Sequence, residues 1–464
     1  MSIFHSLDPL WICLGLYLAF TIFATIGIDK KYKTTTHGYW LSSRNAPSWL
    51  VAVSASSAWL WVLGLLLISR FSIQHGPAGI FWYILPFLAT SVMFGYFVKI
   101  LMKKFPKGFS LNSFISTRYG NKKITYLYQF LQVAACMYAI SGTLTSFGTV
   151  AEYVSSDFDY NVIVAIVGLT VLGYSIWGGQ KACHRTDIIN IVLLLVVSVL
   201  GTLYITSHNG GMSNIIQTWY NQDAKSIFDP NLMYSMGMFL ILIFVGSFLA
   251  DNMQYQNAFS LGDRNKAVKT YWGASLLLLF IMTGFAIISG SVFTISPDTT
   301  IKPDIVQMHI MEKTFGLAGV LFFMLTVLFK ASSVMDSTLN GAGLVVSNDV
   351  FKSKNPIAVS KIATTIIMIL SIIIAILRID IWVLVSTFGL LRIIMIAPTV
   401  YGVLSDRKIK TNVLFYVLIL TTLIGIGSTF IDIEIERATL GLVVFLVPTV
   451  YIFYEHFKTK QLRT

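Results

Sequence analysis

The chain has 464 residues, of which 55% are hydrophobic and 12% charged, about half the charged share of an ordinary soluble domain. Its net charge of +12 lies largely in short loops between apolar blocks, which argues against nucleic-acid binding. The three cysteines show no CxxC spacing, so the sequence indicates neither a disulfide framework nor a metal site.

The apolar blocks are about 18–25 residues long, which is enough to cross a bilayer core of about 30 Å. Because backbone groups inside lipid must bond to each other, each block should form a helix. The first block lacks the basic region and cleavage site of a signal peptide, so we expect a retained span. The sequence predicts an all-α polytopic membrane protein of about thirteen transmembrane helices, at 8–28, 48–70, 78–102, 124–153, 160–178, 187–206, 232–253, 270–294, 315–348, 357–377, 381–404, 412–430 and 438–455.

The loops between these spans alternate in charge. Odd-numbered loops carry basic clusters, such as Lys103, Lys104 and Lys107 in the third, whereas even-numbered loops are poor in positive charge. The positive-inside rule then places the N-terminus outside and the C-terminus in the cytoplasm, which requires an odd number of spans. The short loops favour the inner (cytoplasmic) membrane of a bacterium.

The second predicted span, 48–70, has an unusual composition. It contains the run from Ser54 to Ala58 (SASSA), followed by Gly64. Small hydroxyl residues permit a local unwinding of the helix, whose freed carbonyl groups can bind a cation. The same residues also suit close helix packing, so both interpretations stay open at this stage.

Six short signatures occur in order along the chain. In order and spacing they resemble those of the sodium/solute symporter family, which includes the sodium/proline, sodium/galactose and sodium/sialic acid symporters. They are Tyr39–Pro47 (YWLSSRNAP), the serine-rich run with Gly64, Arg118–Gly120 (RYG), Tyr174–Asp187 (YSIWGGQKACHRTD), Asp251–Gln256 (DNMQYQ), and Ser333–Asn340 (SVMDSTLN) with Asn348–Val350 (NDV).

The resemblance covers residues from about 39 to 355 and implies a five-plus-five inverted-repeat (LeuT-like) core, in which one bundle rocks about a midplane site. It implies four parts of the chain. These are an extra N-terminal span with the first cytoplasmic loop at 1–47, a first repeat at 48–206, a second repeat at 207–404, and two appended spans with a cytoplasmic tail at 405–464.

The resemblance also implies a sodium site between the broken first helix of the repeat and the eighth core helix. Its carbonyl contributors would lie near Ser54 and Ser57, with a backbone carbonyl from position 330 and hydroxyl groups from positions 333 and 334. Oxygen ligands are what a hard cation requires. Ser333 keeps its hydroxyl, but Lys330 replaces a small residue and Val334 replaces a serine or threonine, so the predicted site departs from the family pattern.

Three interpretations of Lys330 remain open. Its ammonium could replace sodium, which would make the carrier proton-coupled, a uniporter or an exchanger, because a desolvated lysine can titrate near neutrality. It could pair with Asp336 or another acid while sodium binds nearby. It could also snorkel along the helix without a role in transport. A charge at mid-span costs about 2.5–3.5 kcal/mol, so such a residue needs an explanation.

Two acids complete the predicted cation site or its substitute. The resemblance places Asp187 and Asp336 along a cation exit path or at a second sodium site. Ser333 and Ser337 share one helix face, toward which Asp336 can lean. The alternatives are a helix N-cap for Asp187 and a plain structural hydrogen bond for Asp336. His184, beside Arg185, is interpreted as a solvated loop residue.

The predicted substrate site contains Ser56 from the serine-rich run, Asp251 and Asn252 at the end of the seventh span, and Arg392 in the eleventh. A guanidinium inside the membrane faces the bundle or a wet cavity, where it suits a carboxylate or phosphate. The alternative for Arg392 is a structural ion pair. With Lys330, it favours an anionic or zwitterionic substrate.

The sequence thus predicts a secondary active transporter for a small polar solute, coupled to a cation gradient through a modified site. The expected partners are the solute and the lipid bilayer, the chain is expected to be a monomer, and no cofactor is expected beyond Na⁺ or H⁺. No enzyme motif is present. A transceptor or sensor that uses a transporter fold is the alternative, against which the short C-terminal tail argues.

Overall fold

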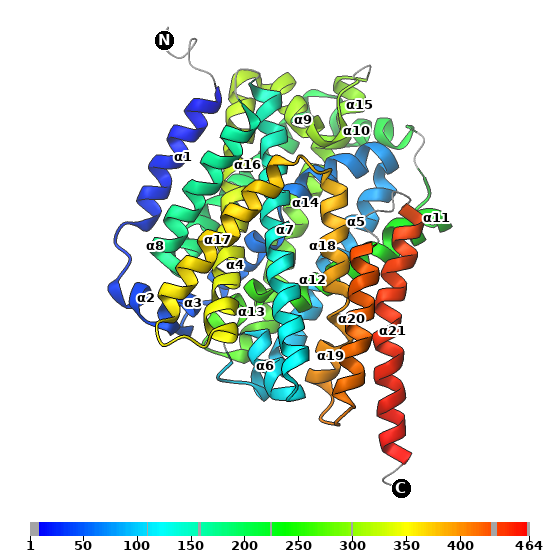
Figure 1. The fold of residues 1–464 in the computed structure, drawn as a ribbon. Helices are drawn as coiled ribbons and strands as arrows, with labels where there is room; N and C mark the ends of the chain where they lie inside the picture. The colour runs from blue at the N-terminus through cyan, green and yellow to red at the C-terminus, as the bar shows by residue number, and fades with distance from the viewer. Residues whose placement is uncertain are drawn as a thin grey trace.

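The computed structural model describes residues 9–108, 110–155, 159–222, 225–297, 300–427 and 434–461, and these are mostly helical (Figure 1). The longer helices run roughly parallel to a common axis, and α1 begins at the opposite end of the bundle from the end of α21 (Figure 1). The helices are α1 Pro9–Thr25, α2 Lys30–Thr34, α3 Thr36–Leu41, α4 Ser48–Trp59, α5 Val62–Lys104, α6 Leu111–Tyr119, α7 Lys122–Val154, α8 Tyr160–Leu195, α9 Gly201–His208, α10 Gly211–Tyr220, α11 Pro230–Leu232, α12 Phe239–Ala250, α13 Asn252–Ser260, α14 Ala267–Gly290, α15 Val292–Ile295, α16 Val306–Leu344, α17 Pro356–Ile376, α18 Ile381–Ile393, α19 Ile396–Leu404, α20 Thr411–Gly427 and α21 Glu434–Gln461.

Nine of the described helices are long and apolar enough to cross a membrane, and two shorter apolar ones are α1 and α20. Three of the long helices contain a sharp turn at a glycine. In α5 this is Gly76 (φ 62°, ψ −153°), followed by Pro77, in α8 it is Gly179 (φ 55°, ψ −155°), and in α16 it is Gly316 (φ 60°, ψ −142°). The turns in α5 and α8 each lie between two predicted spans, and the turn in α16 lies at the start of the ninth, so the described helices account for the predicted spans and confirm the all-α polytopic fold.

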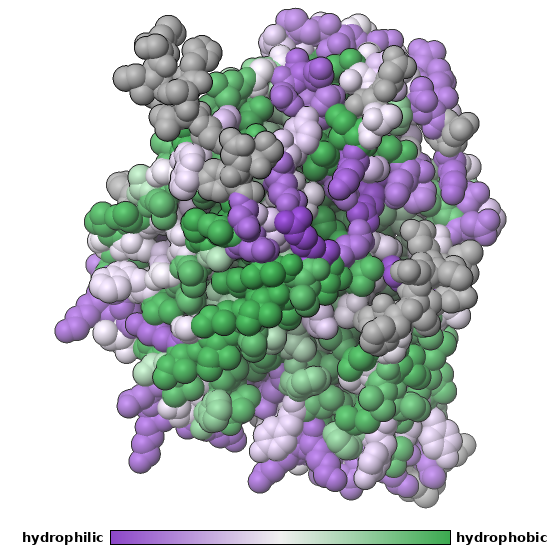
Figure 2. Space-filling model, turned by 45° about the horizontal axis from the view of Figure 1, so that its top comes forward, coloured by the Kyte–Doolittle hydropathy of each residue, from purple (hydrophilic) through white to green (hydrophobic). Residues whose placement is uncertain are grey.

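The outer surface fits a lipid environment. Figure 2 shows a broad belt of hydrophobic residues across the molecule, with hydrophilic residues gathered above and below it. Large apolar side chains such as Leu169, Leu203 and Phe280 are exposed in the long helices. In a soluble protein so large an apolar surface would cause association, whereas in a bilayer it faces acyl chains.

Two helices are interrupted near the middle of the bundle. Between α4 and α5, Leu60 (ψ 107°) and Trp61 (ψ 162°) have extended backbone. Between α12 and α13, Asp251 (ψ 113°) does the same. The breaks fall in the second and seventh predicted spans, the first members of the two predicted repeats. Paired discontinuous helices of this kind mark the binding region of inverted-repeat transporters.

Candidate functional site

The break between α4 and α5 frees backbone carbonyl groups inside the bundle. Because Leu60 and Trp61 are extended, the carbonyl groups of Ser57 and Ala58 leave the regular helical ladder. Ala58 accepts a 2.8 Å hydrogen bond from Trp61 Nε1, and Ser57 accepts one from Lys330 Nζ. The predicted unwinding within the run Ser54–Ala58 is therefore misplaced. These small residues stay helical, and the break comes directly after α4, at Leu60 and Trp61.

Lys330 comes from the middle of α16 and is fully buried. Besides its bond to the Ser57 carbonyl, its ammonium interacts electrostatically with the carboxyl groups of Asp187 and Asp336. In the described part of the chain, no carboxylate oxygen lies within 4.0 Å of Lys330 Nζ. The ammonium thus binds a carbonyl that the predicted sodium site would have used.

Hydroxyl and amide groups surround the Lys330 position on three helices. Ser57 Oγ of α4 lies 2.5 Å from Ser333 Oγ of α16 and accepts a 2.6 Å bond from Asn190 Nδ2 of α8. Ser333 Oγ donates in turn to Asp187 Oδ1 at 2.6 Å. The second oxygen of Asp187 is buried without a hydrogen-bond partner. The structure therefore gathers Ser57, Lys330, Ser333 and Asp187, as predicted, and adds Asn190.

Asp187 is not an N-cap, because it lies well inside α8 beyond the turn at Gly179. The same helix corrects the interpretation of His184, which is buried and not in a solvated loop. Its Nδ1 lies 2.6 Å from Ser54 Oγ, so the hydroxyl of Ser54 faces His184. Residues 184 and 190 are each three positions from Asp187, a helical spacing that could have indicated both from the sequence.

Asp336 lies further along α16, where hydroxyl groups satisfy its carboxylate. Oδ2 accepts bonds from Tyr174 at 2.7 Å and from Thr186 at 3.0 Å, and Oδ1 accepts one from Ser337 at 3.2 Å. Tyr174 and Thr186 belong to the two arms of α8 that meet at Gly179, and Ser337 is the neighbour of Asp336 on α16. The arrangement matches the structural hydrogen bond that we kept as the alternative for Asp336, and direct pairing with Lys330 is absent from the described contacts.

A second cluster lies at the break between α12 and α13. Arg392 Nε of α18 donates to Asp251 Oδ1 at 2.5 Å, and both side chains are buried. The guanidinium also lies 4.4 Å from the ring centre of Phe388 and 5.3 Å from that of Trp61. The structural ion pair that we kept as the alternative for Arg392 is therefore present, and the two charges neutralise each other.

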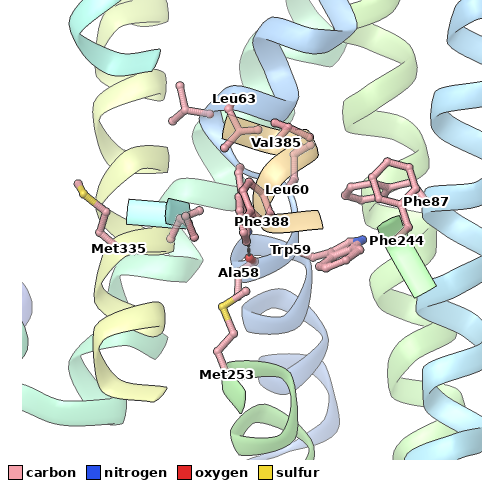
Figure 3. Packing of buried hydrophobic residues seen from close by; sticks show 14 of the residues in the cluster. Ala58, Trp59, Leu60, Leu63, Phe87, Phe244, Met253, Met335, Val385 and Phe388 are labelled. Atoms are coloured by element: carbon pink, nitrogen blue, oxygen red, sulfur yellow. Dashed lines mark hydrogen bonds between the residues drawn. The ribbon is translucent and has the colours of Figure 1, made fainter. Parts of the chain in front are cut away.

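A cavity of about 40 Å³ lies beside the break between α4 and α5, where α4, α5, α12 and α18 meet. Its walls are mainly aromatic, from Trp59, Trp61, Tyr83, Phe87, Phe244 and Phe388. Figure 3 shows Trp59, Phe87 and Phe244 together on one side, with Phe388 near Leu60 on the other. The rings of Trp61 and Phe388 stack 5.1 Å apart and separate the cavity from Arg392.

The remaining predicted substrate residues do not line this cavity. Ser56 Oγ donates to the carbonyl groups of Ala52 at 2.7 Å and Ala274 at 3.1 Å, which turns it toward α14. Asn252 donates to the Gly341 carbonyl and accepts from the Leu111 amide, so it ties α13 to α16 and α6. Both act as packing contacts in this conformation.

An ionic cluster that the sequence analysis missed lies one turn beyond the cavity residue Leu67. Arg70 binds Asp304 through two 2.7 Å bonds, from Nε and Nη2, and Asp380 through a 3.1 Å bond from Nη2. Burial alone would raise the pKa of Asp380, but the bonds and charge of Arg70 lower it overall. The cluster joins α5, the second half of the broken helix, to the starts of α16 and α18.

Comparison with known proteins identifies the group to which this architecture belongs. The profile described as "Sodium:solute symporter family" matches residues 39–415. A probable urea active transporter of Schizosaccharomyces pombe is 25% identical over 199 residues, 41% of this chain and 29% of that protein. A urea–proton symporter of Oryza sativa subsp. japonica is 23% identical over 200 residues, 41% of this chain and 27% of that protein. The matches thus span less than a third of these relatives' length.

Solved structures of transporters share the fold. A Na⁺-coupled sialic acid symporter superposes with a TM-score of 0.76 at 18% identity, covering 96% of this chain and 97% of that one. Mhp1, a nucleobase-cation-symport-1 family transporter, gives 0.57 at 10% identity, covering 93% and 96%. A manganese transporter of Eremococcus coleocola gives 0.55 at 13%, covering 92% and 97%. The chain has the LeuT-like fold of multi-pass membrane transporters and is not an enzyme.

Proposed function

We propose that this chain, which belongs to the sodium:solute symporter family, is a secondary transporter in which the Lys330 ammonium occupies the place of the coupling sodium ion. The observation that supports this is the hydrogen bond from Lys330 Nζ to the Ser57 carbonyl, at the break between α4 and α5. That carbonyl would otherwise face a bound cation.

Electrostatics and ligand count both oppose a sodium ion beside this ammonium. Two unit charges 4 Å apart repel by about 4 kcal/mol at an effective dielectric constant of about 20, which weakens binding about a thousandfold. Val334 supplies no hydroxyl, and the Ser57 carbonyl is already used. The residues present therefore do not fit a sodium ion, and transport should proceed without sodium, driven by a proton or solute gradient.

The two other interpretations of Lys330 have less support. Asp336 receives its hydrogen bonds from three hydroxyl groups and not from the ammonium. Snorkelling toward an interface would leave the ammonium in a polar layer, whereas Lys330 is fully buried and hydrogen-bonded at mid-bundle.

Thermal stability of the purified protein in sodium, potassium and choline salts tests the proposal, because an ion bound only by the folded state stabilises it. We expect equal midpoints for the natural chain. The double variant Lys330→Ala/Val334→Ser restores the missing ligand and removes the ammonium, so it should gain a sodium-specific shift. Adding Ser333→Ala to that variant is the matched control and should abolish the gain. A sodium-specific shift in the natural chain would contradict the proposal.

For the solute, we propose a small, polar molecule without net charge, and urea is the first compound to test. The Arg392–Asp251 pair is neutral as a unit, so an anion would have to compete with Asp251 for the guanidinium. Two relatives of matching sequence are a probable urea active transporter and a urea–proton symporter, although each match covers less than a third of that protein's length. Uptake of radiolabelled urea into proteoliposomes, against liposomes without protein, tests this. Equal uptake in both would exclude urea.

A transceptor remains the second candidate, because a sensor would keep the same fold and binding region. Accumulation of any solute by proteoliposomes separates the two, since a sensor binds without transport.

We further propose that the chain acts as a monomer in the cytoplasmic membrane with its N-terminus outside. Labelling of Lys30→Cys and Thr300→Cys with an impermeant maleimide tests the orientation, because only the second should react in intact cells.

A further inference from the structure

Two adjoining hollows lie at the basic end of the bundle, away from the transport site. The first is a polar hollow of about 440 Å³ between α6, the start of α7 and the π-helical segment η7 (Val345–Val350). The second is an apolar groove of about 490 Å³ between α7 and α20, which lie side by side (Figure 1). Tyr126 lines both, so the polar hollow and the apolar groove adjoin at this residue.

One face of α7 contributes residues to both hollows. On α7, Lys122, Tyr126 and Phe130 follow one another at intervals of four and therefore form one stripe, basic at its start and aromatic beyond. Facing it on α20, Ile419 and Leu423 have the same spacing and line the groove. The side chains of Tyr126 and Phe130 are 59% exposed and that of Leu423 is 62% exposed, so the described chain leaves this groove uncovered.

The polar hollow carries more positive than negative charge. Lys122 and Lys352 line it, and Lys123 lines the groove next to it. In the described residues, none of these three ammonium groups has a carboxylate within 4.0 Å. The acid in the lining is Asp349, whose oxygens accept bonds from three side chains of the protein. These donors are Ser110 at 2.6 Å, Ser113 at 2.9 Å and Asn348 at 2.8 Å.

We propose that the two hollows together bind one anionic phospholipid. Lys122 and Lys352 hold the phosphate of the head group, and the acyl chains lie along the groove beside Phe130 and Leu423. Basic pockets between transmembrane helices suit anionic head groups, and each lysine near the membrane surface strengthens the attraction. A soluble phosphate could bind in the polar hollow but would make no contact with the apolar groove, so the two together favour a lipid.

The test uses the purified full chain in a neutral detergent, with thermal midpoints and native mass spectrometry as the two measurements. Phosphatidylglycerol is compared with phosphatidylcholine of the same acyl chains, and with soluble glycerol 3-phosphate. We expect a saturable stabilisation by phosphatidylglycerol with one retained lipid per chain, a much weaker response to phosphatidylcholine, and none to glycerol 3-phosphate.

Three variants locate the effect. Lys122→Ala/Lys352→Ala should weaken phosphatidylglycerol binding about thirtyfold, the effect of two lysines near the surface. Lys266→Ala/Lys269→Ala removes the same charge from exposed positions of a different basic segment, between α13 and α14 and outside both hollows, and should leave binding unchanged. Leu423→Trp fills the groove without changing charge, and should weaken binding of both phospholipids.

Two results would overturn the proposal. If glycerol 3-phosphate stabilises the protein as well as phosphatidylglycerol, and Leu423→Trp has no effect, the site takes a soluble anion. If both phospholipids stabilise equally and the two double variants behave alike, the response is ordinary solvation by lipid. Neither result depends on the sodium measurements, because Lys122 and Lys352 lie outside the cluster around Lys330.

Discussion

The buried ion pair between Asp251 and Arg392 permits a prediction about two unequal variants. Removing one partner of a buried pair generally costs about 3–5 kcal/mol, because the other charge stays in a medium of low dielectric constant. Here the two remaining charges are not equally supported. Arg392 keeps the faces of Phe388 and Trp61, each worth about 0.5–2 kcal/mol to a cation. Asp251 keeps nothing comparable, since its Oδ2 has no partner and its Oδ1 binds Arg392.

Arg392→Met should therefore destabilise the protein by about 4–5 kcal/mol, near the upper end of that range, and Asp251→Ala by about 3 kcal/mol, near the lower end. The double variant Asp251→Ala/Arg392→Met should cost less than the sum, because no unpaired charge is left. Equilibrium unfolding of the four proteins in one detergent measures this as a double-mutant cycle.

The control for this cycle is Ser247→Ala combined with Arg392→Met. Ser247 lies one turn from Asp251 and lines the cavity, but it carries no charge, so its effect should add to that of Arg392→Met. Additive costs for Asp251→Ala and Arg392→Met would refute the reasoning. So would a larger loss for Asp251→Ala than for Arg392→Met, because the aromatic faces would then give the guanidinium no support.

Three further variants test the ionic cluster around Arg70 and the turn in α8. Arg70→Lys cannot keep two parallel bonds to Asp304, so maleimide should label a Leu67→Cys reporter faster in that background; unchanged labelling would mean that the cluster does not restrict access. Because the pKa of Asp380 is lowered, its ionised carboxylate stabilises the folded protein fully above the ordinary aspartate pKa of about 4. This stabilisation is lost as the pH falls through the lowered pKa, so Asp380→Asn should flatten only the acid limb of the plot of stability against pH. Gly179→Ala should cost about 1–3 kcal/mol from backbone strain alone, and its added Cβ would lie 2.7 Å from Tyr39, whereas helical Gly173→Ala meets nothing within 4 Å and should be neutral by melting temperature.

Features carried by local pattern were predictable from the sequence. The spans follow from runs of apolar residues, and the LeuT-like fold was implied by signatures in the right order. In the cluster of Ser57, Ser333, Asp187 and Lys330, the first three fall within signatures, and Lys330 was predicted because it lies three residues before Ser333, at a position of the implied sodium site. The helix break was misplaced by a few residues, because small side chains permit unwinding but the extended residues that cause it are the bulky Leu60 and Trp61.

Partners distant in the chain were not predictable in the same way. Arg70 binds two acids that are 234 and 310 residues away, and nothing in the pattern around any of the three indicates the others. Arg392 illustrates the same limit, since its sequence environment suits an anion site and an ion pair equally. Only the packing of α18 against α12 decides that Asp251 is the partner. His184 was misread because a basic neighbour suggested a loop, although α8 continues through it.

The cluster around Lys330 suggests how a family named for sodium coupling can accommodate this lysine. A sodium ion and an ammonium carry the same charge, so replacing one by the other leaves the electrostatic balance with Asp187 and Asp336 unchanged. The difference is that a sodium ion can dissociate from the site into solution, whereas the Lys330 side chain stays attached to α16. The bond from Lys330 to Ser57 joins α4 and α16 in this conformation, as a bound ion would do while present. Under the proposed function, the driving force enters through a proton or through the solute itself, and the sodium measurements described above test this.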